Sequence, residues 1–471
     1  MSDDDLSPAL IAARIDPALL ARQRWFRHKG VVLGAIDLAD AWPVRRDEVL
    51  YGWWLLARIP VAEGFATYQL PVRLVPLAEG KPSEERNMLG RIEHAGRAFA
   101  IVDAAADPVM AADLVSRTWR REDEPLRSGS LHIELFSPPV GRPTAVHPVA
   151  QDSSNTLCRL DSRFVLKLYR CLDAAGAREA SLLAALAQYR EAAVPEVNAL
   201  LEYRRDDGER SALALVQEWV DGGQDAWTWF VGRLAAGPTV DLGEELDRMA
   251  SAVASVHRGL LPMGSRTWTR EDTDRLEGRI RRQIEGLQAA TDQPDLLRDL
   301  DAAREQVDRL AISDGGIVMQ VHGDLHLGQM LRRERASELP ARSLAAYLVM
   351  DFEGEPLASP ADRMAPHSPL KDIAGMLRSF DYAAAMARRT GAQGDPSAWD
   401  AWLRRAEDRF LSRYFERMPH VGHDRDRLLS LYLLEKATYE IGYELRARPD
   451  WVDIPRHGLH RVASRITHGH R

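Results

Sequence analysis

The chain has 471 residues, of which 45% are hydrophobic and 28% are charged, and its formal net charge is -8 at pH 7. These values are typical of a soluble protein with two or three domains, and the negative charge argues against nonspecific binding to nucleic acid or to an anionic membrane. The two cysteines, Cys158 and Cys171, lack metal-ligand spacing and suit a reducing compartment. No apolar run approaches membrane-spanning length and no secretory signal is evident, so we expect a cytoplasmic protein.

The first 140 residues predict a small α/β unit followed by a connecting region. Within residues 1–90, a helix is expected near 17–24, and two strands at 49–60 and 66–75 flank a turn. Residues 91–140 form an intermediate subdomain and linker. They add a short strand at 99–102, a helix near 108–120, and a stretch rich in proline and glycine that begins at Ser137.

The remainder predicts two lobes. Residues 141–222 contain a strand at 163–169, a helix at 174–187 and a strand at 213–220, which ends at a plausible hinge, Asp221-Gly-Gly223. Residues 223–471 are mostly helical. The expected helices lie near 241–260, 270–310, 369–390, 397–417 and 425–447.

Two carboxylates follow β-type apolar runs, where loops leave strand ends. Asp324 lies in His322-Gly-Asp-Leu-His-Leu-Gly-Gln329, and Asp351 lies in Asp351-Phe-Glu-Gly354. Phosphoryl transfer needs one carboxylate to orient and deprotonate the attacking hydroxyl and another to hold Mg²⁺. Gln329 can provide a second oxygen ligand to the metal from the same loop as Asp324. Asp324 is therefore the candidate base, and Gln329 and Asp351 are the candidate metal ligands.

Other interpretations of these motifs remain open. Aspartates are common in β-turns, and the side chains of His322, Asp324 and His326 could converge on a metal ion. The order of the whole set favours a kinase, with His-x-Asp, an amide five residues on, and Asp-Phe-x after another strand. Gln329 stands where protein kinases have Asn, and Glu353 where they have Gly. His-Gly-Asp resembles small-molecule kinases of the aminoglycoside-phosphotransferase type.

Lys167, in the middle of its strand, and Glu179, near the start of the next helix, have the order of the kinase lysine–glutamate pair that contacts nucleotide phosphates. A solvated lysine on a strand edge is the alternative. The preceding loop could cover phosphates through hydroxyl and backbone N–H groups, or be an ordinary polar turn. Its candidate residues are Ser153, Ser154, Asn155 and Thr156. Adenine would meet backbone groups of the segment from Gln217 to Val220.

Lys436, Tyr439 and Tyr443 have the spacing i, i+3 and i+7, which places them on one face of a helix. A lysine and two tyrosines on one stripe form an aromatic surface with polar edges, which suits a sugar. A core stripe with packed rings and a snorkelling lysine is the alternative.

Several segments resemble the bacterial maltokinase family. They are His322–Gln329, 351–356, 367–382, 435–445 and 448–451, together with Gln23-Arg-Trp-Phe26 and Lys29-Gly30 near the N-terminus. The resemblance implies a two-lobed, α+β, protein-kinase-like fold with an additional N-terminal α/β cap subdomain. It also implies ATP- and Mg²⁺-dependent phosphorylation of maltose to maltose 1-phosphate for α-glucan synthesis, with a separate trehalose synthase as a possible partner.

Residue by residue, the resemblance implies that Asp324 is the catalytic base and that Gln329 and Asp351 are metal ligands. It implies that Lys167 contacts the phosphates. Lys436, Tyr439 and Tyr443 match positions lining the maltose site. The chain departs from the family pattern in a longer insert between Leu331 and Tyr347 and in the loop around Ser153 to Thr156. The rival interpretations are a kinase of this fold acting on another sugar, such as glucosamine, and a catalytically silent kinase-like binding module.

Overall fold

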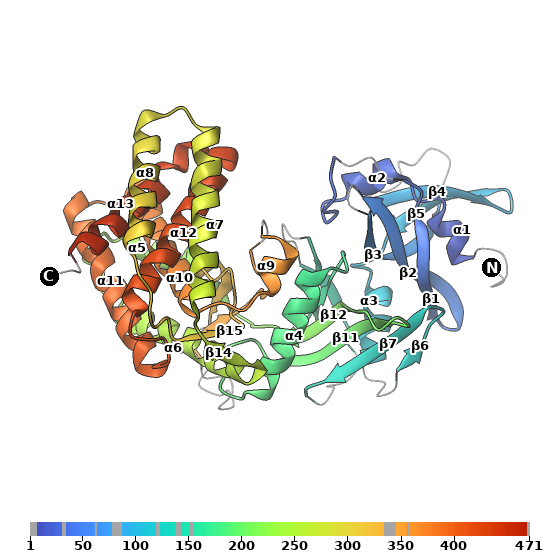
Figure 1. Ribbon diagram of the computed structural model, residues 1–471. Helices are drawn as coiled ribbons and strands as arrows, with labels where there is room; N and C mark the ends of the chain where they lie inside the picture. The colour runs from blue at the N-terminus through green and yellow to red at the C-terminus, as the bar shows by residue number, and fades with distance from the viewer. Residues whose placement is uncertain are drawn as a thin grey trace. The chain divides into compact units, whose positions relative to one another are not determined.

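The computed structural model of the chain describes residues 7–30, 34–61, 64–77, 87–118, 123–137, 143–149, 154–333, 345–355 and 358–468. The chain forms two compact units. The first comprises Met1–Ala187 and Pro195–Asp221, and the second comprises Gln188–Val194 and Gly222–Arg471. In Figure 1 the first unit runs from blue to green and the second from yellow-green to red.

The first unit begins with a five-stranded antiparallel sheet in the order β1-β2-β3-β5-β4. Its strands are β1 (Asp37–Arg46), β2 (Val49–Val61), β3 (Gly64–Pro76), β4 (Met88–His94) and β5 (Arg97–Asp103). Two short helices, α1 (Pro8–Ala12) and α2 (Pro17–Arg22), contribute side chains to the apolar core of this sheet. The hairpin β4–β5 continues the sheet beyond residue 90, where the sequence suggested the end of the first subdomain.

A second sheet of seven antiparallel strands follows in the order β6-β7-β11-β12-β10-β9-β8. Its strands are β6 (Glu124–Pro125), β7 (Gly129–Leu135), β8 (Val146–Pro148), β9 (Thr156–Leu160), β10 (Phe164–Leu168), β11 (Val197–Arg205) and β12 (Arg210–Glu218). The unit also contains the helices α3 (Pro108–Thr118) and α4 (Ala174–Gln188). Because β10 pairs with β9 on one side and with β12 on the other, a side chain in its middle is not on a sheet edge.

The second unit is mainly helical (Figure 1). Its helices are α5 (Ala226–Leu234), α6 (Gly243–Leu260), α7 (Arg270–Ala290), α8 (Pro294–Arg309), α9 (Pro360–Met364), α10 (Leu370–Arg389), α11 (Pro396–Arg417), α12 (Arg425–Ala447) and α13 (Asp453–His468). Short strands interrupt them, namely β13 (Gln224–Asp225), β14 (Ser265–Thr267), β15 (Ile317–Met319), β16 (Met330–Arg332) and β17 (Tyr347–Val349). No helix in the described ranges combines the length and apolar character that crossing a membrane requires.

The single helix expected over residues 270–310 is wrong, because two helices occupy this range. Thr291 is extended and ends α7, and Pro294 opens α8 at a first-turn position. Proline has no backbone N–H and a fixed φ, so it can begin a helix but interrupts one. The helices expected near 369–390, 397–417 and 425–447 are confirmed by α10, α11 and α12.

Candidate active site

The loop that carries Asp324 is held by a buried carboxylate from α10. The backbone N–H groups of His322 and Gly323 each donate to Asp372, at 2.7 Å to its two oxygens. Burial alone would raise the pKa of Asp372, but its hydrogen bond with His257, the nearby histidines and the backbone N–H of Gly323 hold that pKa at about 2. The carboxylate therefore stays ionised and fixes the backbone just before Asp324.

Helix α10 also lies very close to this loop. A Cβ atom on Gly375 would be 2.2 Å from the carbonyl oxygen of Leu325, which is far below van der Waals contact. On the same helix, the hydroxyl of Ser379 accepts a hydrogen bond from the Leu327 N–H at 3.0 Å. Glycine at position 375 is needed because the helix backbone and the loop backbone are in direct contact.

The ring nitrogens of His322 make hydrogen bonds inside the protein. Its Nε2 is 2.8 Å from the carbonyl oxygen of Met350 and so donates, while its Nδ1 accepts from the Asp324 N–H at 3.3 Å. Burial lowers the pKa of His326, which favours its neutral form. The Nδ1 of this residue accepts a hydrogen bond from the Gly328 N–H at 3.0 Å. These bonds fix the loop and argue against a metal site built from His322, Asp324 and His326.

Gln329 and Asp351 are brought together by the hairpin β16–β17. Met330 pairs with Val349 in this hairpin, so the residues at its end face each other. The Gln329 Nε2 donates to Asp351 Oδ2 at 3.2 Å. Asp351 has a φ of +63°, a left-handed conformation that is uncommon for residues other than glycine and typical of functional sites. Both side chains carry oxygen atoms, the donors that Mg²⁺ prefers, so the pair fits the expected metal ligands.

Phe352, next to Asp351, anchors this segment in the core. Its side chain is fully buried, and its ring centroid is 4.7 Å from that of His322. This ring contact packs the segment after β17 against the loop of Asp324.

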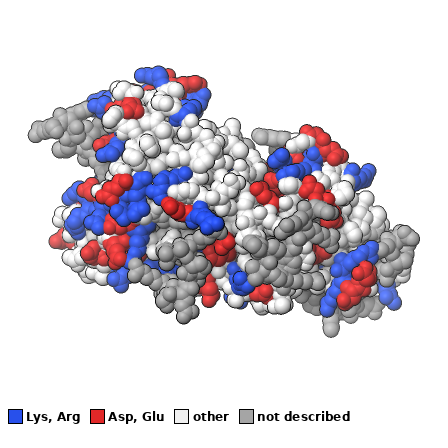
Figure 2. Space-filling view, turned by 90° about the horizontal axis from the view of Figure 1, so that it is seen from below, with Lys and Arg blue, Asp and Glu red and all other residues white. Residues whose placement is uncertain are grey.

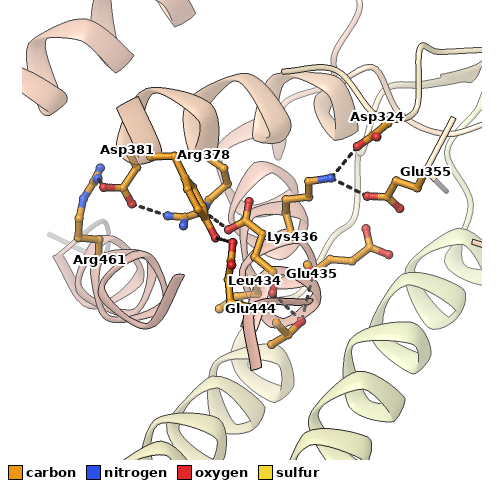
Figure 3. A network of polar contacts seen from close by, with 12 residues as sticks. Asp324, Glu355, Arg378, Asp381, Leu434, Glu435, Lys436, Glu444 and Arg461 are labelled. Carbon is orange, nitrogen blue, oxygen red and sulfur yellow. Dashed lines mark hydrogen bonds and ion pairs between the residues drawn. The ribbon is translucent and has the colours of Figure 1, made fainter. Parts of the chain in front are cut away.

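Lys436 on α12 lies between two carboxylates (Figure 3). Its Nζ is 3.0 Å from Asp324 Oδ1 and 2.7 Å from Glu355 Oε1. A second lysine, Lys371, is 3.6 Å from the other oxygen of Glu355. Burial disfavours the charges, but Asp324 and Glu355 raise the pKa of Lys436 well above its usual value, and the two lysines lower the pKa of Glu355 to about 2.

These residues line a pocket within the second unit. The other lining residues include Gln283, Gly323, Gly375, Tyr432, Glu435 and Tyr439. Glu435 is paired with Arg279, with 2.6 Å between Oε1 and Nε. Around the pocket, three carboxylates are thus matched by three cations. Glu355 was not a candidate in the sequence analysis, although it lies within a segment that carried the family resemblance.

The two candidate tyrosines of α12 have different surroundings. Tyr439 is half-buried in the pocket, and the Nζ of Lys436 lies 5.0 Å from its ring centroid. Tyr443 is 42% exposed and does not line this pocket. The guanidinium of Arg448 lies over both Tyr443 and Trp451, at 5.6 and 4.7 Å from their ring centroids. The core-stripe alternative is therefore wrong for Tyr443, because so exposed a ring is not packed in a core.

In the first unit, Lys167 and Glu179 form a buried ion pair. The lysine Nζ is 2.6 Å from Glu179 Oε2, and the hydroxyl of Tyr169 donates to the same oxygen at 2.8 Å. Lys167 is 9% exposed and Glu179 is 2% exposed. The alternative of a solvated edge lysine is wrong, because β10 is an inner strand and α4 brings the glutamate onto it.

The remaining nucleotide candidates lie around this pair or outside the described residues. Ser153 lies outside them. The Ser154 hydroxyl accepts from Arg27 at 2.9 Å, and the Thr156 hydroxyl accepts from Arg170 at 3.2 Å. Asn155 is buried, Gln217 pairs with Val165 between β12 and β10, and Val220 is buried just after β12. The second half of the expected loop is therefore fixed by arginine contacts rather than by glycine.

Comparison with known proteins identifies the two parts of the chain. Residues 145–341 match the family described as phosphotransferase enzyme family, and residues 19–107 match the maltokinase N-terminal cap domain. The chain is thus similar to this phosphotransferase family over residues 145–341 and to the cap domain over residues 19–107. The expected α+β, kinase-like fold with an N-terminal cap is confirmed.

Two curated relatives of this chain bear the name glucosamine kinase. One from Streptacidiphilus jiangxiensis is 30% identical over 262 residues, which cover 52% of this chain and 56% of the relative. Another, from Mycolicibacterium smegmatis, is 27% identical over 278 residues, or 54% of this chain and 64% of the relative. The matches thus span less than two thirds of these curated relatives. A glucosamine kinase structure solved with glucosamine, ADP and inorganic phosphate shares the fold, with a TM-score of 0.73, 21% identity and coverage of 97% and 99% of the two chains.

Proposed function

We propose that this protein is an ATP- and Mg²⁺-dependent sugar kinase of the phosphotransferase family, and that its acceptor is maltose, phosphorylated at the anomeric hydroxyl to maltose 1-phosphate. The observation that carries the proposal is the pocket around Asp324. A carboxylate on a loop held by Asp372 faces a pocket that also contains an ionised lysine and an aromatic ring. General bases act from positions of this kind, within hydrogen-bond reach of the proton they remove.

In the proposed reaction, Asp324 orients the anomeric hydroxyl and accepts its proton. The sugar oxygen forms a bond to the γ-phosphorus of ATP, the bond from that phosphorus to the β–γ bridging oxygen breaks, and ADP leaves. Lys167, paired with Glu179, neutralises phosphate charge. Gln329 and Asp351 would hold Mg²⁺, which supplies charge neutralisation on the phosphate oxygens when bound. Most of the rate enhancement would come from positioning and electrostatics.

Two observations favour maltose as the acceptor. Residues 19–107 match a cap domain described for maltokinases. The charges around the pocket are balanced, because Lys371, Lys436 and Arg279 match its three carboxylates, and a balanced pocket suits an uncharged sugar better than an ammonium ion.

Glucosamine is the second candidate, because two relatives carry the name glucosamine kinase. An ammonium group could bind Glu355 or Glu435 if a lysine or arginine moved aside. A silent binding module is the least supported rival, since Asp324, Asp351 and Lys167 are all present. We also propose that the protein acts in the cytoplasm. A separate trehalose synthase is a proposed partner, and co-purification of the two proteins would test this.

A phosphorylation screen tests the proposal. Purified protein is incubated with ATP, Mg²⁺ and, in parallel, maltose, glucose and glucosamine, and the product is identified by NMR. We expect maltose 1-phosphate as the main product. The variant Asp324→Asn should lose about 10²–10⁴-fold in kcat while still binding nucleotide, since it removes the general base.

Asp408→Asn, at an exposed position on α11, is the matched control and should keep normal activity. Preferred phosphorylation of glucosamine would replace maltose by the second candidate. If Asp324→Asn retained kcat within a few-fold of the wild type, the assignment of the base would be wrong.

A further inference from the structure

Four arginines line one groove of the second unit, on α6 and α11. Arg248 and Arg258 come from α6, and Arg413 and Arg417 come from α11. The groove has no lining residue in common with the pocket of Asp324 and Lys436. In Figure 2, basic and acidic side chains lie side by side on the surface of the helical unit. The groove is thus a separate concave surface in which four arginines lie among three carboxylates.

Three of these arginines have acidic partners, mostly at the protein surface. Arg248 pairs with Glu244 and Glu245 on its own helix. Arg413 pairs with Glu416 at 2.9 Å, and Arg258 is 3.5 Å from Glu191, whose side chain is 72% exposed. Surface pairs of this kind are weak and exchange readily with solvent or with a ligand.

Arg417 differs from the other three. Within the described parts of the chain it makes no ion pair, and its Nε is buried without a hydrogen-bond partner. Burial and the neighbouring charges of Arg413 and Arg258 lower the pKa of Arg417 below its usual value. The charge of Glu416 acts in the opposite direction, but no carboxylate among the described residues forms an ion pair with this partly buried guanidinium, which lies beside two like charges. An anion in the groove would offset the repulsion among Arg417, Arg413 and Arg258.

We propose that the groove between α6 and α11 binds a phosphate group, either inorganic phosphate or the phosphate of a small monoester, with Arg417 as its main ligand and Arg258 and Arg413 beside it. The planar guanidinium presents paired N–H donors that match phosphate oxygens. Glu191, which is 3.5 Å from Arg258, Glu244 and Asp247 also line the groove. Their charges disfavour an extended polyanion and select a small ligand.

Titration calorimetry on the full-length protein tests the site. Inorganic phosphate and glucose 1-phosphate are titrated separately at constant ionic strength, without nucleotide. The variants are Arg417→Gln, Arg417→Lys and, as the matched control, Arg404→Gln, an exposed arginine on the same helix outside the groove. Asp324→Asn serves as a control for binding in the proposed active site.

Arg417→Gln should weaken phosphate binding at least about tenfold, because it removes charge-assisted hydrogen bonds, and Arg417→Lys should weaken it less. Arg404→Gln and Asp324→Asn should bind phosphate like the wild type. In phosphate-free buffer the melting temperature of Arg417→Gln should equal or exceed that of the wild type, since a crowded charge is relieved. Tighter binding of glucose 1-phosphate than of phosphate would identify a monoester ligand, and the reverse order would identify inorganic phosphate. Equal phosphate affinity in Arg417→Gln and Arg404→Gln, or undetectable binding to the wild type, would overturn the proposal.

Discussion

Removing the charge of Lys436 tests the pocket most directly. Its ammonium group lies within 3.0 Å of oxygens from both Asp324 and Glu355, and the three side chains are 17%, 16% and 14% exposed. In Lys436→Met the two carboxylates would share a pocket without the cation between them. Breaking a largely buried pair in this way costs about 3 kcal/mol of unfolding free energy at pH 7, at the lower end of the range because the groups are not fully buried. For a unit of this size, that lowers the melting temperature by about 5–10 °C.

The effect should depend on pH in a defined direction. The folded-state pKa of Glu355 is lowered to about 2, so its contribution to stability is complete above its unfolded pKa of about 4.3 and disappears as the pH falls through about 2. The pKa of Lys436 is raised, so its contribution is complete below its unfolded pKa of about 10.4 and disappears at more alkaline pH. The difference between the wild type and Lys436→Met is therefore largest between about pH 5 and pH 10 and smaller at pH 3.

Urea denaturation at pH 7 measures the loss of unfolding free energy in Lys436→Met, and the same experiment at pH 3 measures how that loss changes with pH. Lys371→Met is the matched control, because Lys371 is 3.6 Å from Glu355 and approaches only one of the two carboxylates. It should cost less than Lys436→Met. Adding Glu355→Gln to Lys436→Met should restore part of the lost stability, since it removes one of the two facing charges. A loss below about 0.5 kcal/mol in Lys436→Met, or strict additivity in the double variant, would refute the reasoning.

Three further outcomes are expected. Asp351→Ala should raise the Mg²⁺ concentration needed for half-maximal activity, because it removes a charged oxygen ligand; an unchanged Mg²⁺ dependence would leave Asp351 as a turn residue. Asp372→Asn should lower kcat about tenfold or more with both KM values little changed, because one of the oxygens that hold the His322–Gly323 backbone becomes a donor; an unchanged kcat would mean that the loop keeps its position without this carboxylate. Tyr443 lies outside the pocket of Asp324, so only the second ring of a disaccharide would contact it in the proposed complex. Tyr443→Ala should therefore raise KM for maltose but not for glucose or ATP, and its 42% exposure predicts a nearly unchanged melting temperature. Early melting without a selective maltose effect would remove Tyr443 from the proposed sugar site.

Helices of the second unit could be predicted where the apolar spacing was long and the ends carried clear signals. Pro396 opens α11 at a first-turn position, and α12 ends within a residue of the expected boundary at 447. Long amphipathic repeats leave little choice of period. Strands such as β11 were missed, because a short apolar run can belong to a buried helix as easily as to a strand until its partners are known.

The candidate site divides in the same way. Asp324, Gln329 and Asp351 could be proposed because loop chemistry concentrates them within two short segments, where their order along the chain carries the information. Lys167 and Glu179 were found through a strand followed by a helix. Asp372 carries no such signal. It contacts a loop 49 residues earlier in the chain, and it does so from a helix whose sequence shows only an ordinary acidic residue in its first turn.

Glu355 illustrates why the rest could not be predicted. A glutamate near Asp351 has no assigned role until the fold brings Lys436 to it from 81 residues away. The net charge around the pocket then depends on every charged neighbour, because Lys436 contacts two carboxylates and Arg279 pairs with Glu435. Sequence gives the residue types but not these distances, and charge interactions of this kind depend on distance and burial. In the proposed function, acceptor choice would rest on that balance. Short motifs therefore suffice to propose phosphotransferase chemistry, whereas discrimination between a neutral and a cationic sugar would be a property of the folded pocket.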